Sequence, residues 1–251
     1  MFLIVIPGYD DPHRLEFVLA GLIGQTDSDF EIHLVNDGGD TRLQDIFHQN
    51  FPRGHYTYMG PRSSRFRAGA ARNLGAAVCE DNGRILFLDQ DVVLQRDAVS
   101  IHKSYGNSPV IVCGVRRRIE GVPRRLAELS SWPQTGDDRF RRDGWRSDRY
   151  PYALDMCRSG RFYPELCHGF QISYPAAAFR ALGGFWDEMT ISEDQELAMR
   201  AVRLGCSTIL DPRAIGYHIE HPLRCGSDER AKMRLLLQRS EEMPGVVRNG
   251  V

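Results

Sequence analysis

The chain has 251 residues, of which 42% are hydrophobic, 26% charged and 10% aromatic, as is usual for a folded globular protein. This composition excludes a disordered chain and a collagen-like repeat. The formal net charge is −1, so no global field attracts the chain to nucleic acid or to a membrane surface. The apolar run at 2–6 is too short for a signal-peptide core or a membrane span, and we expect no transmembrane segment.

The cysteine spacing argues against a metal or redox motif. The six cysteines lie at least ten residues apart, so the Cys-x-x-Cys spacing of zinc ribbons and thioredoxin-like sites is absent. A chain of this length buries a sufficient core without disulfides. We therefore expect reduced thiols and a cytoplasmic location.

The first 35 residues predict a strand, a helix and a second strand. Residues 2–6 are continuously apolar, as in a strand buried on both faces. Leu15, Val18, Leu19 and Leu22 then recur at helical spacing, and 30–35 is the second strand. This order predicts a βαβ unit and a parallel sheet.

The α/β alternation continues along the chain. We expect further strands at 56–59, 84–88, 110–115 and 207–210, and helices at 67–78, 96–105, 175–182, 193–204 and 229–242.

The segment 116–149 has a different character. It carries ten Arg and six Asp or Glu, a net charge of +4, with little periodicity. We expect a long loop, which in a compact domain is usually functional or mobile. Two interpretations stay open: a solvated surface insertion, or a cover that binds an anionic acceptor through arginine. Such an acceptor would be a carboxylate-bearing small molecule, an acidic carrier protein or a phosphorylated lipid carrier.

Acidic turns follow three of the predicted strands. Asp89 and Asp91 end the strand 84–88, Asp37 follows the strand 30–35, and Asp10 follows the first strand. In open α/β sheets ligands bind beyond the carboxyl ends of the strands, and paired carboxylates suit Mg²⁺ or Mn²⁺. Each turn alone is equally compatible with ordinary turn chemistry; their joint occurrence favours a site.

Three further features allow both a structural and a functional interpretation. Arg72 lies in a helix of small residues and could reach a phosphate with its planar fork, or could be a surface arginine. Ser192 and Gln195 have capping-box spacing, while the carboxylates between them could include a general base. His218 and His221 are three residues apart, without a third close ligand for a self-contained zinc site.

Taken in order, these motifs resemble the family 2 glycosyltransferases of the GT-A fold. The resemblance rests on Ile6-Pro7-Gly8-Tyr9-Asp10, Val35-Asn36-Asp37-Gly38-Gly39-Asp40, Ala71-Arg72-Asn73-Leu74-Gly75, Leu88-Asp89-Gln90-Asp91, Gly183-Gly184-Phe185 and Glu193-Asp194. It implies an α/β GT-A (nucleotide-diphospho-sugar transferase) fold with a mainly parallel central sheet flanked by helices. Gly8 replaces a commoner Thr or Ser, and Gly39 replaces a Ser.

The resemblance implies a donor site in the first half of the chain. Asp37 would bind the base of a nucleotide, usually uracil, in a pocket shaped by Pro7 and Tyr9. Arg72 and Asp89 would also lie at the nucleotide.

The resemblance also implies a metal and a base. Asp91 would bind the divalent cation, Mn²⁺ or Mg²⁺, with His218 or His221 completing the site. Asp194 would be the catalytic base, with Glu193 binding the acceptor or orienting the base.

The resulting hypothesis is an inverting, metal-dependent glycosyltransferase, moving a hexosyl or N-acetylhexosaminyl group from a UDP-sugar to a hydroxyl or amine. A non-catalytic nucleotide-sugar binding module and a sugar nucleotidyltransferase are the alternatives. The nucleotidyltransferase lacks support because no glycine-rich phosphate loop with a basic residue follows the first strand. We expect one catalytic domain at 1–222, with a donor half at 1–115 and an acceptor half at 116–222, and a helical tail at 223–251.

Overall fold

The structure is a computed structural model that describes residues 1–62, 66–119, 134–135, 164 and 167–219. Its strands are β1 (Phe2–Gly8), β2 (Glu31–Asn36), β3 (His55–Tyr58), β4 (Arg84–Leu88), β5 (Val92–Leu94), β6 (Val110–Ile119), β7 (Gln134–Thr135), β8 (Gln171–Pro175) and β9 (Ser207–Ile219). Its helices are α1 (Pro12–Ile23), α2 (Arg42–Asn50), α3 (Ala68–Ala76), α4 (Ala98–Lys103), α7 (Ala176–Ala181) and α8 (Glu193–Arg203).

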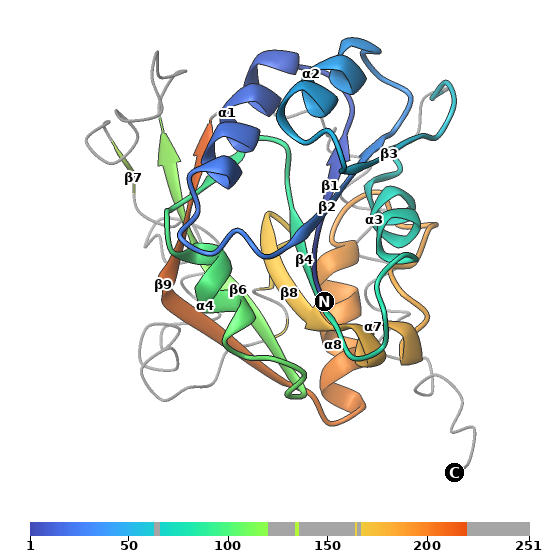
Figure 1. The fold of residues 1–251 in the computed structure, drawn as a ribbon. Coiled ribbons are helices and arrows are strands. Elements are labelled where there is room, and N and C mark those ends of the chain that lie inside the picture. Colours follow the sequence, from blue (N-terminus) through green and yellow to red (C-terminus); the bar gives the residue numbers. More distant parts are fainter. Residues whose placement is uncertain (63–65, 120–133, 136–163, 165–166, 220–251) are drawn as a thin grey trace.

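All of these strands belong to one sheet, in the order β3-β2-β1-β4-β8-β6-β9-β5, with β7 beside β6 (Figure 1). The first four strands in this order are parallel, as the βαβ pattern predicted. Beyond them the sheet is mixed: β8 is antiparallel to both β4 and β6, β6 and β9 are parallel, and β5 is antiparallel to β9. The expectation of a mainly parallel sheet therefore holds for the first half of the chain only.

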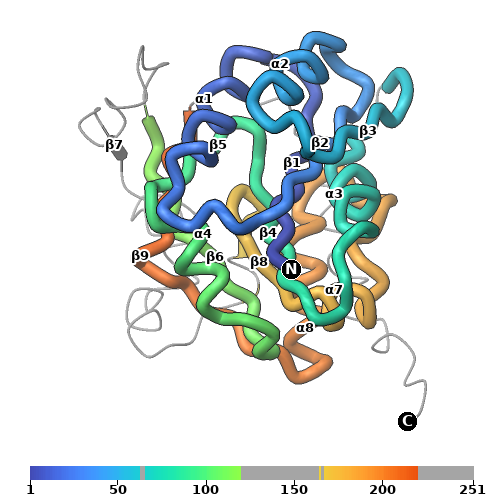
Figure 2. The backbone as a smooth tube through the Cα atoms, in the orientation of Figure 1, coloured from blue at the N-terminus to red at the C-terminus, as the bar shows by residue number. Residues whose placement is uncertain are grey.

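Helices cover both faces of the sheet. Because side chains alternate along a strand, Ile4 and Ile6 of β1 pack with α1 and α2, whereas Leu3 and Val5 join the core under α3, α7 and α8. Figures 1 and 2 show α1 and α2 together at the top of the view and α3, α7 and α8 at the right and below. The central strands are thus buried on both sides, which explains their continuously apolar sequences.

Four elements escape the sequence pattern: α2, β5, β7 and β8. In β8 the residues that alternate with Ile172 and Tyr174 are polar but fully buried. Ser173 Oγ lies 2.9 Å from His102 Nδ1 and accepts a hydrogen bond from Arg84 Nε at 3.2 Å. Because these bonds replace hydration, a polar row can lie inside the sheet, where hydropathy patterning does not predict a strand.

Strand β9 is longer than predicted because it passes an irregularity. It was expected at 207–210 but runs to Ile219. Its register against β6 shifts after Gly114: Gly114 pairs with Asp211, and the next residue of β6 pairs with Ile215. The extra residues form a bulge in β9, which accommodates Pro212 without ending the strand.

The segment 116–149 is described in part. Strand β6 continues through its first four residues, and β7 lies in its middle. The remainder lies outside the described residues, as do the predicted helix at 229–242 and the tail at 223–251. In the part of the chain that the structure describes, the helices are too short or too polar to span a membrane. The four cysteines described there are buried free thiols.

The turns after β1 and β2 touch at Gly39. A Cβ atom at this position would lie 1.6 Å from the carbonyl oxygen of Tyr9 and 2.2 Å from its carbonyl carbon. The same oxygen accepts a hydrogen bond from the backbone N–H of Asp40 at 2.7 Å. The contact is backbone against backbone, so glycine is required here, where the family resemblance leads one to expect serine.

We expect Gly39→Ala to lower the free energy of unfolding by about 1–3 kcal/mol, the usual cost of overpacking. Denaturant unfolding measures the change. Gly24→Ala is the matched control, because a Cβ there meets its nearest atom, the Ala20 carbonyl oxygen, at 3.5 Å. Equal stability of the two variants would show that the turns separate without cost.

Candidate functional site

The carboxyl ends of β1, β2 and β4 meet at one edge of the sheet, as expected for parallel neighbours. The backbone N–H of Asp37 donates to Gly8 at 2.7 Å. The Gln90 side chain accepts from the backbone N–H of Tyr9 at 2.7 Å and donates to the carbonyl of Asp10. The predicted convergence of the three acidic turns is confirmed.

Asp37 is paired with two arginine side chains. Its carboxylate is buried and accepts from Arg67 Nε at 2.6 Å, from the Arg67 backbone N–H at 3.1 Å and from Arg62 Nη1 at 3.3 Å. The Arg62 guanidinium lies 3.4 Å from the centroid of the Tyr9 ring, and half-buried Pro7 pairs with Val35 beside it. Sequence analysis missed both arginines; the signal was the basic run at 61–67 after β3.

Arg72 lies between two carboxylates from distant parts of the chain. Its Nη2 donates to Asp89 Oδ1 at 2.7 Å and its Nη1 to Glu193 Oε1 at 2.6 Å. Arg72 is 4% exposed, so it is not a surface arginine. Burial alone would lower its pKa, but the charges of Asp89 and Glu193 raise it above its ordinary value. The guanidinium therefore stays protonated.

Asp194 begins helix α8 beside this arginine. One carboxylate oxygen accepts from the backbone N–H of Gly169 at 2.5 Å and the other from that of Gln195 at 2.8 Å. Burial, and then repulsion from Glu193, raise the pKa of Asp194 to about 7. The capping box is wrong: Ser192 adopts φ 62° and its side chain makes no capping hydrogen bond. The acidic residues at the start of α8 are therefore not part of a capping box, and their carboxylates face the site.

Asp91 and His218 form a second pair at the same sheet edge. His218 Nε2 lies 3.7 Å from Asp91 Oδ2, and both side chains are partly buried. The backbone fixes this proximity, because the N–H of Ile219 donates to the carbonyl of Asp91 at 2.9 Å. A carboxylate and an imidazole suit Mn²⁺ and fit a cation that also binds substrate oxygen atoms. No cluster of three such ligands occurs within the described ranges, and His221 lies outside them.

The turn at Gly183 and Gly184 is anchored by hydrogen bonds to α3. Both glycines adopt φ 76°. The side chain of Asn73 donates to the carbonyl of Phe185 and accepts from its backbone N–H, each at 2.8 Å. The resulting turn places the Phe185 ring under Arg72, whose guanidinium carbon lies 5.4 Å from the ring centroid. The predicted small-residue helix, α3, therefore also fixes the turn that leads to α8.

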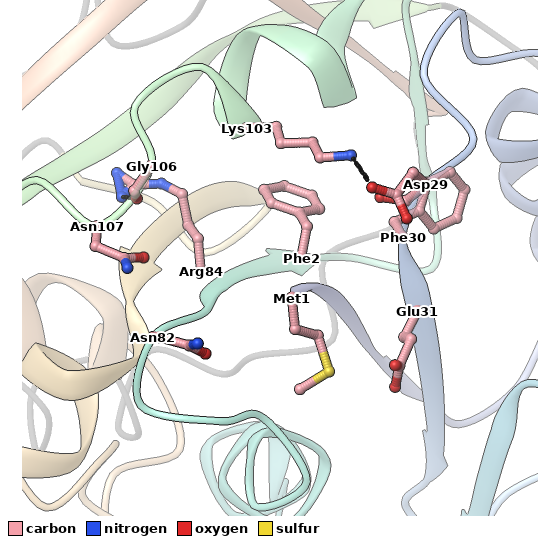
Figure 3. Close-up of a pocket in the computed structure, with 10 residues that line it drawn as sticks. All are labelled: Met1, Phe2, Asp29, Phe30, Glu31, Asn82, Arg84, Lys103, Gly106 and Asn107. Atoms are coloured by element: carbon pink, nitrogen blue, oxygen red, sulfur yellow. Dashed lines mark hydrogen bonds and ion pairs between the residues drawn. The ribbon is translucent and has the colours of Figure 1, made fainter.

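A cavity of about 480 Å³ lies at the opposite edge of the sheet. Met1, Phe2 and Glu31 at the starts of β1 and β2 line it (Figure 3). Its cation Lys103 is paired with Asp27 and Asp29 at 3.0 and 2.8 Å. The cavity thus has a separate location from the converging carboxylates.

Similar solved structures have the same fold. S. aureus TarS residues 1–349 in complex with UDP matches with a TM-score of 0.62 at 15% identity, covering 95% of this chain and 64% of TarS 1–349. The mannosyltransferase PcManGT from Pyrobaculum calidifontis in complex with GDP-Man and Mn²⁺ matches with a TM-score of 0.63 at 15% identity, covering 97% of this chain and 64% of its own. This chain thus spans less than two thirds of the length of either.

At these identities the matches establish the GT-A fold. No curated protein matches this chain in sequence. The sequence model of glycosyl transferase family 2 matches residues 3–166, which is well over half of the chain and includes the turns that carry Asp37, Asp89 and Asp91. The chain therefore belongs to glycosyl transferase family 2.

Proposed function

We propose that this chain transfers a hexosyl or N-acetylhexosaminyl group from a UDP-sugar to an acceptor hydroxyl or amine, with a divalent cation and with inversion at the sugar. One observation carries the proposal: the partly buried carboxylate of Asp194, whose pKa is raised to about 7, lies beside the arginine that binds Asp89 of the donor-side turn. A group half-deprotonated near neutral pH is well matched to general-base catalysis.

The donor nucleotide would bind at the ends of β1 and β2. Asp37 would accept hydrogen bonds from the base, and Tyr9 would offer its ring for stacking. In the structure the Arg62 guanidinium covers that ring, so a base stacking there would displace Arg62. TarS and PcManGT, of the same fold, are solved with UDP and GDP-Man, which supports a nucleotide donor; the choice of UDP rests on the family resemblance.

Asp91 and His218 would hold the divalent cation. When bound, the cation supplies positive charge that neutralises the leaving diphosphate without proton transfer. The protein would hold the two ligand side chains next to the donor-side turn. It does so through the pairing of β9 with β5.

Asp194 would remove the proton from the acceptor. Its two oxygens are oriented by the backbone N–H groups of Gly169 and Gln195, so the side chain cannot rotate freely. Attack by the acceptor on the face opposite the diphosphate gives single displacement with inversion, and Glu193 would orient the base through Arg72.

We also propose an anionic acceptor, on the strength of the arginines at the end of β6. Arg116, Arg117 and Arg118 are half-buried, and Arg118 is the cross-strand partner of His218. The acceptor would be a small molecule, a carrier protein or a lipid carrier with phosphate or carboxylate groups. The free buried thiols support the proposed cytoplasmic location.

Asp37→Ala should weaken UDP binding by roughly 10- to 100-fold, because a hydrogen bond to a charged acceptor is worth about 1.5–3 kcal/mol. Calorimetric titration with UDP and, in parallel, GDP measures the loss and the base preference. Asp40→Ala is the control, since the Asp40 carboxylate bonds to Arg42, through its largely exposed guanidinium and its backbone N–H, and not to Tyr9 or Asp37. Unchanged UDP affinity in Asp37→Ala would place the base elsewhere.

Asp91→Asn should lower transfer by more than about 100-fold, since the loss of even an outer-shell partner of a metal costs 10- to 100-fold. EDTA should have the same effect on the wild type, with recovery on adding Mn²⁺ or Mg²⁺. UDP release from a panel of UDP-sugars is the assay. Asp97→Asn, an equal charge change on an exposed residue, should behave as wild type. Full activity in EDTA would exclude the cation from the mechanism.

Asp194→Asn should lower transfer by a factor on the order of 10² to 10⁴ and leave UDP affinity nearly unchanged. In the wild type the rate should rise with pH through about 7, because only the deprotonated carboxylate accepts a proton. Glu188→Gln on the neighbouring exposed turn is the control. A collapse of UDP binding in Asp194→Asn would make this residue part of the donor site instead of the base.

A further inference from the structure

The guanidinium of Arg72 is held by contacts within the protein. Its two terminal nitrogens bind Asp89 and Glu193. A Cβ atom at Gly169 would lie 3.0 Å from Nη2 and 3.2 Å from the guanidinium carbon, so the backbone of Gly169 packs directly against the fork. The Phe185 ring is also within reach. The two terminal nitrogens of Arg72 therefore bind carboxylates of this chain, whereas the sequence led us to expect that they bind the nucleotide.

The segments that Arg72 holds are also those that hold Asp194. Glu193 directly precedes Asp194, and Gly169 donates its backbone N–H to the Asp194 carboxylate. Helix α3, which carries Arg72, lies against the start of α8: a Cβ atom at Gly69 would lie 3.6 Å from Cγ of Glu193, an ordinary contact distance. Moving or removing Arg72 would therefore disturb the support of Asp194 from two sides.

We propose that Arg72 is a positioning residue that, by bridging Asp89 and Glu193, keeps Asp194 in its working place and proton state and ties the donor-side turn to the base. The proposal deepens the proposed function, since it takes Asp194 to be the base. It differs from the expectation for Arg72 drawn from the sequence, in which the guanidinium binds the nucleotide.

The charges around Asp194 give the bridge its electrostatic effect. Helix α8 contributes Glu193 and Arg200, α3 contributes Arg72, the end of β4 contributes Asp89, and β8 contributes the buried hydroxyl of Tyr174. Burial and Glu193 raise the pKa of Asp194, while Arg72 lowers it. Without this cation Asp194 would keep its proton to higher pH, because a nearby positive charge favours the deprotonated carboxylate.

The decisive experiment titrates Asp194 directly. The Cγ carboxyl signals of ¹³C-labelled aspartates are followed by NMR from pH 5 to 9, with Asp194→Asn assigning the signal. We expect the Asp194 midpoint of Arg72→Met to lie about one pH unit or more above that of the wild type, because a nearby opposite charge lowers a carboxyl pKa by about 1–3 units. Arg72→Lys keeps the charge but loses the fork, so its midpoint should still rise, by less than half as much.

Arg200→Met is the matched control for loss of a structural ion pair. Arg200 lies on the same helix and binds Glu196 and the carbonyls of Leu182 and Gly184. We expect it to lower the thermal midpoint without moving the Asp194 titration. If Arg72→Met also lowers only the thermal midpoint, Arg72 is structural and the proposal fails. If Arg72→Met does not fold, Arg72→Lys decides: an upward shift supports the proposal and an unmoved midpoint overturns it.

Calorimetry with UDP and MnCl₂ separates this proposal from the nucleotide-binding alternative. We expect Arg72→Met to bind UDP within about threefold of the wild type. A loss of tenfold or more, with an unmoved Asp194 midpoint, would make Arg72 a nucleotide ligand. If the wild type itself does not bind UDP, the donor assignment fails, whereas the NMR titration still tests the bridge.

Discussion

The parallel pairing of β1 with β2 and β4 is the constraint on which the site depends. Parallel neighbours end at the same edge of a sheet, so the polar turns after three strands have to share one small volume. Backbone hydrogen bonds such as that from Asp37 to Gly8 then fix their register. The helices that cover both faces of the sheet bury its apolar side chains and so keep these strands paired. The site lies at the carboxyl ends of the strands.

The site has more carboxylates than positive charges around Arg72. Glu193 is buried, Asp89 and Asp194 are partly buried near it, and Arg72 is the guanidinium that contacts Asp89 and Glu193. A carboxylate removed from water is costly unless it is paired and hydrogen-bonded, so the pKa values of Asp89 and Asp194 are raised. Because few positive charges lie near Asp194, its carboxyl group changes charge near neutral pH. No further group is needed to raise its pKa.

Much of the donor side could be predicted from the sequence, because its information is local. Apolar runs identify β1, β2 and β4, and the residues directly after them carry the acidic turns. Arg62 and Arg67 could not be assigned, since contact with Asp37 depends on how the chain returns after β3. The partners of Arg72 could not be predicted for the same reason, because Glu193 is 121 residues away in the sequence. β8 stayed hidden because its polar residues are satisfied by a buried histidine and arginine.

The bulge in β9 restricts how the chain can vary in length. Side chains alternate along a strand, so removing or adding one residue at 212–214 would turn every following side chain to the opposite face. His218 would then leave the side of the sheet where Asp91 lies, even if every residue of the site were kept. Surface loops of a protein generally tolerate insertions and deletions, but this short stretch, which carries none of the proposed site residues, has to keep its residue count.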